Sequence, residues 1–378
     1  MANEASSLPV GAGLQLNNMK SYTQIPPGTQ ILIGPAAQRR RVLERAICSV
    51  FEGWSYEEII PPIFDYYDVF IKGMGTGLEK QIYRFIDREG NILALRPEFT
   101  SLVAKTVATR LASAPKPIRL FYSGEVLRFE QPKGGRQREF AQVGIENYGG
   151  SSKTADAEIL LIAVEAFERV GIPTFQINLG SVDFFGGIMD RIDLPSEDVV
   201  ALKDVLNLKD QSGLETLLSR LPLEERGKNI LRAIPHLTGG RAVIEEARKL
   251  VRNPRSADSL DHLDEIYSTF ERLGLARHLT IDLGEIRGFD YYTGILFRAY
   301  VPELGFEVAN GGRYDGLPGV FGKDLPAVGF SFSLDRLEQI VAPKLTAADG
   351  EPSIVDAAGG FEKALQLRRS GKAVKLCL

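Results

Sequence analysis

Cysteine and histidine are scarce in this chain, which has two cysteines and three histidines among 378 residues. Cys48 and Cys377 lie far apart, and His236, His262 and His278 share no metal-ligand spacing. We therefore expect no metal site, no cofactor held by such ligands, and no Ser/His/Asp or Cys/His nucleophile set. The two distant cysteines also predict a reduced, cytoplasmic setting.

An excess of basic charge and long apolar runs are missing as well. The chain has 45 basic and 49 acidic side chains, a net charge of −4, which is not the basic footprint of a nucleic-acid-binding protein. No apolar run approaches the length that spans a membrane, and the polar stretch from Met1 to Pro9 has no signal-peptide core. The 44% hydrophobic and 25% charged content is typical of a globular protein with one large domain and an insertion.

Strand patterns in the first half of the chain are paired as hairpins rather than as repeated strand–helix–strand units. Residues 118–129 and 138–148 alternate apolar and polar side chains, and a Gly- and Pro-containing linker joins them, which predicts a long hairpin. Helical spacing follows in 153–170. This order predicts an α+β domain built on an antiparallel sheet. A strand and then a helix from about Thr100 are expected in 91–111, with Thr100 as a candidate cap.

The stretch 186–278 is rich in Leu, Arg and Glu and predicts an inserted helical subdomain within a core of residues 31–342. Residues 1–30 are expected to be irregular. Strand patterns return at 279–283, 294–300 and 305–309, followed by a turn at Gly311-Gly312 and a helix after Gly329. Residues 343–360 have the composition of a linker within the terminal segment 343–378, which should end in a short helix and a strand.

The segment Arg287-Gly-Phe-Asp-Tyr-Tyr-Thr-Gly294 carries the strongest chemical signal. On a strand, Arg287 and Tyr291 would face one side and Tyr292 the other. A guanidinium binds a carboxylate or phosphate through two hydrogen bonds, and phenols add directed hydrogen bonds around an apolar site. A buried strand with one arginine at its end remains an equally open interpretation.

A second polar set lies on the later arm of the predicted hairpin, where Gln142 and Glu146 share strand parity. One carboxylate and one amide on a single face could hold an ammonium group or an imidazole N–H. The alternative is a row of polar side chains that faces solvent. Arg128 ends the first arm, and Arg136 lies in the connecting loop, so a zwitterionic or phosphate-bearing ligand would suit this hairpin, as would a merely solvated tip.

Glu98 lies beside the expected helix start, where it could bind a ligand or simply stabilise the helix dipole. The glycine-rich run Asn310-Gly-Gly-Arg-Tyr-Asp-Gly316 matches neither the P-loop nor the dinucleotide-binding pattern. A tight strand-to-helix connection explains that run as well as a phosphate cradle does.

Taken in order, these stretches closely resemble the catalytic core of class II aminoacyl-tRNA synthetases, and histidyl-tRNA synthetase in particular, from about residue 26 to 340. Gly53 to Phe64 resembles the motif through which that family dimerises. Arg128-Phe-Glu130 with its loop and following strand resembles the motif that holds ATP, and Gly329 to Arg336 resembles the third motif, whose arginine reaches ATP. The segments 287–292 and 311–315 resemble the two histidine-specific motifs.

The resemblance implies a binding site for histidine. By matched position, the α-ammonium would be held by Glu98, Thr100 and Gln142, and the carboxylate by Arg128 and Arg287. The imidazole would be held by Glu146 and Tyr292, with Tyr291 beside them. Charge pairing at both ends of a buried zwitterion is physically required.

The departures from the synthetase pattern fall on ATP and tRNA functions. Only 42 residues follow Arg336 in the 378-residue chain, too few for an anticodon-binding domain. Phe99, Ala141, Ser333 and Asp335 stand where synthetases have glycine, histidine, glycine and glutamate, and a side chain at a glycine position can obstruct a nucleotide.

This combination resembles the regulatory subunits of ATP phosphoribosyltransferase, a family of synthetase paralogues. That resemblance implies a non-catalytic allosteric subunit, with no catalytic residues of its own, which binds L-histidine as feedback inhibitor in histidine biosynthesis. It also implies a hetero-oligomer with the short-form catalytic subunit, a homodimer within it, and no role for tRNA or membranes. The alternatives are a truncated synthetase-like enzyme that forms histidyl-adenylate, and a scaffold whose histidine site no longer works.

Overall fold

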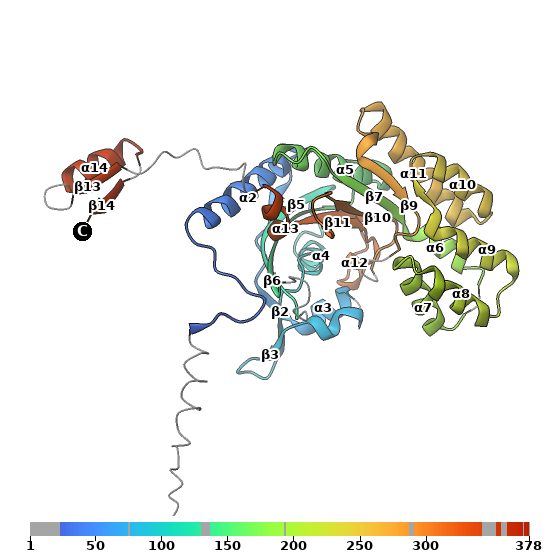
Figure 1. The fold of residues 1–378 in the computed structure, drawn as a ribbon. Helices are drawn as coiled ribbons and strands as arrows, with labels where there is room; N and C mark the ends of the chain where they lie inside the picture. The colour runs from blue at the N-terminus through green and yellow to red at the C-terminus, as the bar shows by residue number, and fades with distance from the viewer. Residues whose placement is uncertain are drawn as a thin grey trace, which may run out of the picture.

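A nine-stranded sheet forms the centre of the molecule (Figure 1), which is a computed structural model. The described residues are 23–74, 76–129, 137–192, 194–286, 291–341, 353–356, 361–372 and 374–377. The strand order is β1-β5-β6-β12-β11-β10-β7-β9-β8. The β1–β5 and β7–β9 pairs are parallel, and every other neighbouring pair in this sheet is antiparallel. The predicted α+β class with a largely antiparallel sheet is confirmed.

The strands of this sheet have the following bounds: β1 (Glu57–Glu58), β5 (Ile118–Leu127), β6 (Glu139–Tyr148), β7 (Gln176–Ser181), β8 (Thr238–Gly239), β9 (Leu279–Asp282), β10 (Ile295–Tyr300), β11 (Glu307–Arg313) and β12 (Ala327–Ser333). A smaller sheet of order β2-β4-β3 is formed by β2 (Phe64–Tyr66), β3 (Arg84–Ile86) and β4 (Ile92–Leu95). Near the C-terminus, β13 (Ser353–Asp356) pairs in parallel with β14 (Val374–Cys377).

The predicted hairpin is confirmed as β5 and β6, which pair from Ile118↔Tyr148 to Leu127↔Glu139. Because side chains alternate along a strand, this register divides the sheet into two different faces. One face carries small and polar residues of β6 and β12, such as Gly144, Glu146 and Ser331. The opposite face carries apolar residues and forms the larger core.

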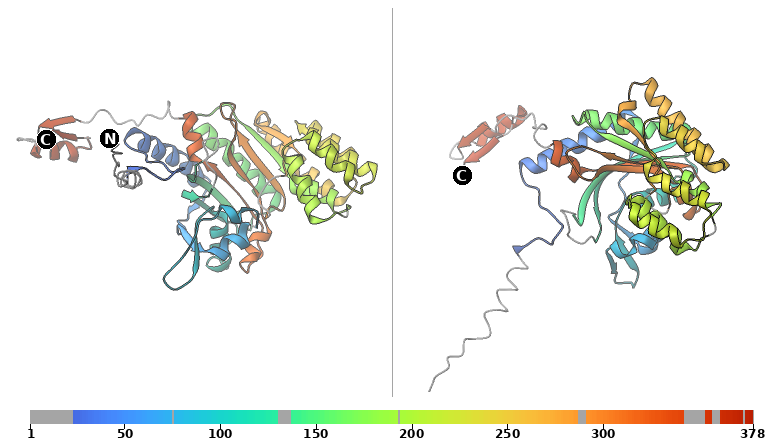
Figure 2. Two further views of the ribbon diagram at one scale, coloured as in Figure 1. Left: turned by 60° about the horizontal axis from the view of Figure 1, so that its bottom comes forward. Right: turned by 45° about the vertical axis from the view of Figure 1, so that its right-hand side comes forward.

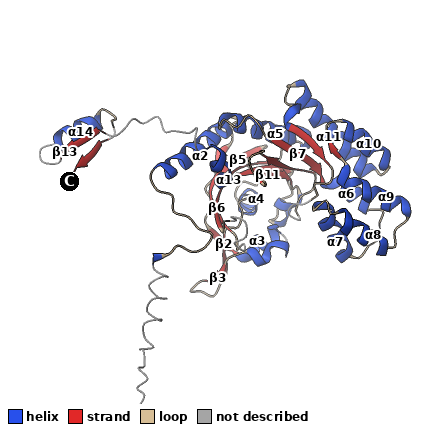
Figure 3. Ribbon diagram, in the orientation of Figure 1, coloured by secondary structure: helices blue, strands red, loops and turns tan. Residues whose placement is uncertain are grey.

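Helices cover both faces of the sheet (Figures 2 and 3). The helices α2 (Pro35–Gly53), α5 (Ser152–Arg169) and α13 (Leu334–Val341) pack on the apolar face, where Phe51, Phe167 and Phe330 are buried. The shorter α4 (Thr100–Thr109) covers the polar face at β5 and β6 and closes a second core around Val103 and Tyr122. The polar face therefore lies between the sheet and α4, so its charged groups are buried.

Residues 182–272 are mainly helical, and Figure 1 shows these helices beside one end of the large sheet. They are α6 (Val182–Met189), α7 (Ser196–Asn207), α8 (Gln211–Arg220), α9 (Glu225–Ala233), α10 (Ala242–Leu250) and α11 (Pro254–Arg272). The remaining described helices are α3 (Tyr67–Met74), α12 (Gly316–Val320) and α14 (Phe361–Arg369), with short 3-10 turns at Thr76–Gln81, Ile234–His236 and Ala276–His278. Among the described helices, none has the length and apolar character needed to cross a bilayer.

Three local predictions are wrong. Gly311 and Gly312 do not form a turn but lie inside β11, paired with Phe297 and Leu296 of β10. They are glycines because the sheet is crowded there: a Cβ on Gly312 would lie 2.7 Å from Cε1 of Tyr292.

The other two errors concern strands that composition concealed. Residues Ala327–Ser333, where a helix was expected after Gly329, form the central strand β12, and the helix begins only at Leu334. Alternation of Val328, Phe330 and Phe332 with smaller residues explains the strand. The expected linker 343–360 contains β13.

Candidate functional site

Glu146, on β6, is the centre of the buried polar cluster between the sheet and α4. Its side chain is almost fully enclosed, at 1% exposure. Thr100 donates a hydrogen bond to Oε1 at 2.9 Å, Tyr122 donates to Oε1 at 3.3 Å, and Tyr314 donates to Oε2. We call Glu98, Thr100, Tyr122, Glu146 and Tyr314 the carboxylate cluster. The solvent-facing interpretation of the Gln142–Glu146 row is wrong, because Gln142 is also buried at 8% exposure.

Glycines on the neighbouring strands make room for this cluster. Gly329 pairs with Glu146 across β12 and β6, and a Cβ on Gly329 would collide with the Glu146 carboxylate. Gly144 pairs with Tyr122, and a Cβ on Gly144 would lie 2.7 Å from the phenol oxygen of that tyrosine. The glycines therefore determine how closely the phenol and the carboxylate approach each other.

The electrostatics of the cluster favour a ligand that brings positive charge or N–H donors. Burial raises the pKa of Glu146 to about 8, against the opposing hydrogen bonds from Tyr314 and Thr100. Burial raises the pKa of Glu98 as well, while hydrogen bonds from Ser101 and the charge of Arg128 oppose the increase. Two buried carboxylates are stabilised when a cation or an N–H donor enters between sheet and helix.

Thr100 was the predicted cap of α4, but Glu98 makes the capping hydrogen bond. Thr100 is the first residue of α4, and its hydroxyl bonds Glu146 instead of capping the helix. Glu98 accepts hydrogen bonds from the Ser101 backbone N–H at 3.0 and 3.1 Å and thereby satisfies a free donor of the helix N-terminus. Glu98 therefore caps the start of α4 through these hydrogen bonds, and its burial at 3% exposure places its carboxyl group within the carboxylate cluster.

Phe99, the residue between them, is packed and not exposed. Its ring stacks on Tyr122 with 4.1 Å between centroids, and the Arg96 guanidinium lies 3.9 Å from its centroid on the other side. Arg96 is itself held by main-chain oxygens of Glu125 and Pro61. This three-layer stack supports the Tyr122 ring from behind, so that its hydroxyl reaches Glu146.

Tyr291 and Tyr292 lie in a turn before β10, so the strand-parity argument for them is wrong. Strand pairing begins only at Ile295. Their rings lie 5.1 Å apart, and both pack against the core that contains Tyr122 and Tyr314. Burial raises the pKa of Tyr291, so this phenol keeps its proton. The predicted site residue Arg287 lies outside the described residues, as does the loop 130–136 with Arg136.

Arg128 and Gln142 complete the predicted set. Arg128 donates from Nε to the Pro97 carbonyl oxygen at 2.8 Å, and its guanidinium lies 5.3 Å from the ring centroid of Phe140. Burial raises the pKa of Glu98 and the charge of Arg128 partly opposes this rise, which indicates that Arg128 lies near the carboxylate cluster. Gln142 lies opposite Gly124 of β5 and Ser333 of β12, on the same face as Glu146. The structure thus brings seven of the eight predicted residues to one region, the eighth being Arg287.

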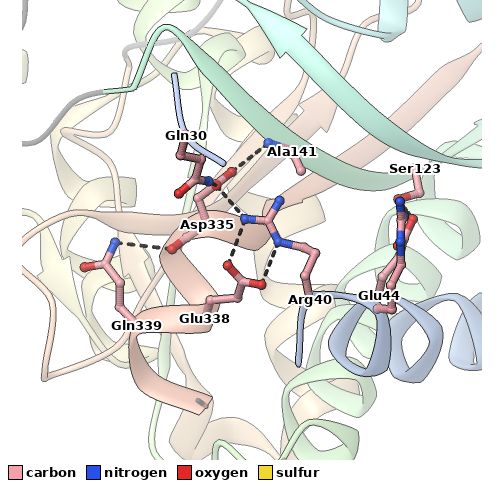
Figure 4. Close-up of polar contacts among 9 residues, drawn as sticks. Gln30, Arg40, Glu44, Ser123, Ala141, Asp335, Glu338 and Gln339 are labelled. Carbon is pink, nitrogen blue, oxygen red and sulfur yellow. Dashed lines mark hydrogen bonds and ion pairs between the residues drawn. The ribbon is translucent and has the colours of Figure 1, made fainter. Parts of the chain in front are cut away.

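A different group of charges lies where β12 meets α13 (Figure 4). Arg40 of α2 donates to Glu338 at 2.7 and 2.8 Å and to Asp335 at 2.6 Å. Asp335 also accepts from the backbone N–H of Ala141 at 2.6 Å, next to Gln142 in the chain. Nearby, Arg336 donates to the main-chain oxygen of Glu307 and to its carboxylate at 3.0 Å. We call Arg40, Glu307, Asp335, Arg336 and Glu338 the arginine cluster.

Two members of the carboxylate cluster were missed in the sequence. Tyr122 could have been found from its register, because it lies opposite a glycine between two polar positions of β6. Tyr314 stands in a motif that was noted, but its contact with Glu146 depends on a separation of 168 residues. Within the described part of the chain, no group of three or more His, Cys, Asp or Glu side chains could hold a metal ion.

Comparison with known proteins identifies the family of the chain. The sequence profile of the family described as Histidyl-tRNA synthetase matches residues 28–337. The ATP phosphoribosyltransferase regulatory subunit of Moorella thermoacetica is 39% identical over 364 residues, covering 93% of this chain and 92% of the relative. The protein of the same name from Syntrophotalea carbinolica is 38% identical, covering 87% of this chain and 77% of the relative.

Solved structures give the same result. The ATP phosphoribosyltransferase regulatory subunit/histidyl-tRNA synthetase of Bacillus halodurans superposes with a TM-score of 0.83 at 28% identity, covering 94% of this chain and 92% of that one. Histidyl-tRNA synthetase of Nostoc has a TM-score of 0.77 at 22% identity, covering 94% and 86% of the two chains, a likeness of fold alone. The chain belongs to the ATP phosphoribosyltransferase regulatory subunits, the non-catalytic paralogues within the histidyl-tRNA synthetase-like family.

Proposed function

We propose that this chain binds L-histidine at the carboxylate cluster and transmits feedback inhibition to a short-form catalytic ATP phosphoribosyltransferase subunit, in a cytoplasmic hetero-oligomer. The α-ammonium would meet Glu98, Thr100 and Gln142, and the carboxylate would meet Arg128 and Arg287. Glu146 and Tyr292 would hold the imidazole, with Tyr291 beside them.

The observation that carries this proposal is the environment of Glu146. Its carboxylate is buried, accepts hydrogen bonds from three hydroxyl groups, and has a pKa raised by burial to about 8. An imidazole N–H is a donor of the right kind for such an acceptor. The ligand would act as an effector only to the extent that it binds two states of the complex with different affinity.

The arginine cluster supports a regulatory rather than an adenylate-forming role. The Arg336 guanidinium, which by resemblance would meet ATP, is bonded to Glu307 and lies 4.9 Å from the ring centroid of Phe306. Although burial opposes it, the charge of Arg336 lowers the pKa of Glu307, so the Glu307 carboxylate stays ionised at neutral pH. We therefore expect no histidine-dependent ATP–pyrophosphate exchange and no tRNA charging.

A homodimer is supported by the surface of the segment 53–64. The side chains of Ile60, Ile63 and Phe64 are 84%, 48% and 46% exposed, and apolar side chains gathered in this way commonly mark an interface. Sedimentation of the wild-type chain and of Ile60→Glu tests this proposal. We expect a dimer for the first and a monomer for the second, and a wild-type monomer at micromolar concentration would contradict it.

The test of the function combines binding, exchange and inhibition on one preparation. L-histidine should raise the melting temperature of the purified chain, as any ligand well above its dissociation constant must. Pyrophosphate exchange should be absent, and L-histidine should inhibit the complex reconstituted with the catalytic subunit. Exchange activity would replace this proposal by the enzyme alternative, and the absence of a thermal shift would favour a scaffold with a vestigial site.

A further inference from the structure

Arg313 ends β11 and lies on the opposite side of the sheet from Glu146. Because side chains alternate, Arg313 faces α5 while the next residue, Tyr314, meets Glu146. Arg313 donates from Nε to Oδ2 of Asp156 at 3.2 Å and from Nη2 to Oδ1 of the same carboxylate, which is fully buried on α5. From Nη1 it donates to Asp315 at 2.8 Å. Two carboxylates thus fix the guanidinium from two sides.

The Asp156 carboxylate has a second partner on the helical segment. His262 of α11 lies with its Nε2 2.7 Å from Oδ2 of Asp156, and its side chain is 18% exposed. One buried carboxylate therefore joins α11 to the arginine at the end of β11. A carboxylate that is shared in this way cannot move towards one partner without loosening the other.

The main chain around Arg313 supports two parts of the proposed histidine site. The Thr293 N–H donates to the Arg313 carbonyl oxygen at 2.8 Å, and the Asp315 N–H donates to the Thr293 hydroxyl at 2.9 Å. Thr293 directly follows Tyr292. Gly294 leaves space for the arginine stem, because a Cβ there would lie 2.9 Å from Cδ of Arg313. A shift of Arg313 would therefore move Tyr314 and the Tyr292 segment together.

We infer that Arg313, Asp156 and His262 are positioning residues that couple helix α11 to the Glu146 carboxylate through Tyr314. The inference rests on the proposed function, because it makes α11 the element that responds to L-histidine. Coupling of this kind is reciprocal: a change at His262 alters the affinity for L-histidine, and L-histidine alters the local unfolding of α11 that hydrogen exchange reports.

The chain offers a matched control for this experiment. Lys153 and Glu265 form an ion pair between the same two helices, α5 and α11, with side chains that are 65% and 49% exposed. If simple docking of α11 were all that mattered, Lys153→Met and His262→Leu would act alike. A positioning role predicts that only the histidine substitution affects ligand binding.

Calorimetric titration of the full chain with L-histidine tests the inference. We expect His262→Leu to weaken binding by roughly fivefold or more, at the lower end of measured coupling between sites. His262→Gln, whose amide nitrogen can take the place of Nε2, should stay within about twofold of wild type, as should Lys153→Met. In hydrogen exchange, L-histidine should slow the α11 amides around His262 in wild type but not in His262→Leu.

Three outcomes overturn the inference: unchanged binding by His262→Leu, equal weakening by Lys153→Met, or no rescue by His262→Gln.

If the wild-type chain itself binds no L-histidine, the proposed function fails, and the positioning role is then decided on unliganded protein. There, the Tyr314 amide, bonded to the Ala327 carbonyl oxygen at 2.8 Å, should exchange faster in His262→Leu than in Lys153→Met. Equal exchange rates of the Tyr314 amide in the two variants would refute the positioning role. Should His262→Leu fail to fold, His262→Asn, which is too short to reach Asp156, replaces it with the same expected results.

Discussion

The carboxylate cluster and the arginine cluster differ in how their charges are balanced. In the first, Glu146 is buried and accepts hydrogen bonds from three neutral hydroxyl groups. In the second, the Arg40 guanidinium meets the carboxylates of Asp335 and Glu338, and Arg336 meets that of Glu307. The same fold thus balances the charges of the arginine cluster within the chain, whereas the hydrogen bonds to the Glu146 carboxylate come from neutral groups.

The difference has a physical consequence for stability. A buried carboxylate without a cationic partner opposes folding, whereas a fully hydrogen-bonded ion pair joins the elements that supply its partners. The arginine cluster joins helix α2 to α13 and, through Asp335, to β6 (Figure 4). We therefore expect substitutions in the carboxylate cluster to change ligand binding, and substitutions in the arginine cluster to change stability.

The largest expected effect is on histidine binding by Glu146→Gln. This variant keeps the shape of the side chain but cannot lose a proton to become the charged acceptor of an imidazole N–H, and a hydrogen bond to a charged group contributes about 1.5–3 kcal/mol, so affinity should fall roughly 10- to 100-fold. Its unliganded stability should be equal to or higher than that of wild type, because the cost of burying a charge disappears.

Calorimetry and urea unfolding measure these two effects, with Glu139→Gln, at the other end of β6, as the matched control. A Glu146→Gln variant that binds L-histidine as tightly as wild type would show that the cluster is not the effector site.

The next largest effect is on stability, by Arg40→Met. The arginine is 9% exposed, and its removal leaves two largely buried carboxylates without their cation. The free energy of unfolding should fall by roughly 3 kcal/mol, the lower end for breaking a buried ion pair, whereas Arg45→Met, an exposed position on the same helix, should change it by less than about 0.5 kcal/mol. The affinity of the folded variant for L-histidine should stay within about twofold. A stability equal to that of Arg45→Met would mean that the cluster does not join α2 to α13 in solution.

A third prediction concerns pH. Because burial raises the pKa of Glu146 in the folded chain to about 8, above the value near 4.3 of an unfolded glutamate, folding favours the neutral carboxyl group. Its contribution to stability is complete below about pH 4 and is lost as the pH rises through about 8. Unfolding in urea from pH 6 to 9 should therefore show wild type losing stability relative to Glu146→Gln, by at most about 1.4 kcal/mol per pH unit. Parallel curves for the two proteins would place the Glu146 pKa in its ordinary range.

The sequence was sufficient for the parts of the site that depend on local pattern. Strand parity put Gln142 and Glu146 on one face, and the hairpin that carries them forms between the two segments expected to pair. The sequence is insufficient where contacts between distant segments determine the local structure. The glycines Gly311 and Gly312 suggest a turn when considered alone, but they lie in strand β11, where Phe330 and Tyr292 leave no room for a side chain. The Thr100 hydroxyl likewise leaves its local capping role for a carboxylate 46 residues away.

The smallest expected effect is that of Glu307→Gln, which tests whether Glu307 neutralises the charge of Arg336. Glu307→Gln removes the carboxylate that balances Arg336, but the guanidinium keeps its hydrogen bond to the Glu307 main-chain oxygen. Because both side chains are about a third exposed, stability should fall by no more than about 1 kcal/mol. Affinity for L-histidine should not change. If the Glu307 carboxylate is what neutralises Arg336, its removal should leave that positive charge available to an anion. The variant should then bind tripolyphosphate weakly, whereas wild type should not. Titration calorimetry at low ionic strength measures the affinity for tripolyphosphate. A variant that gains no such affinity would show that the ion pair with Glu307 is not what keeps anions from Arg336.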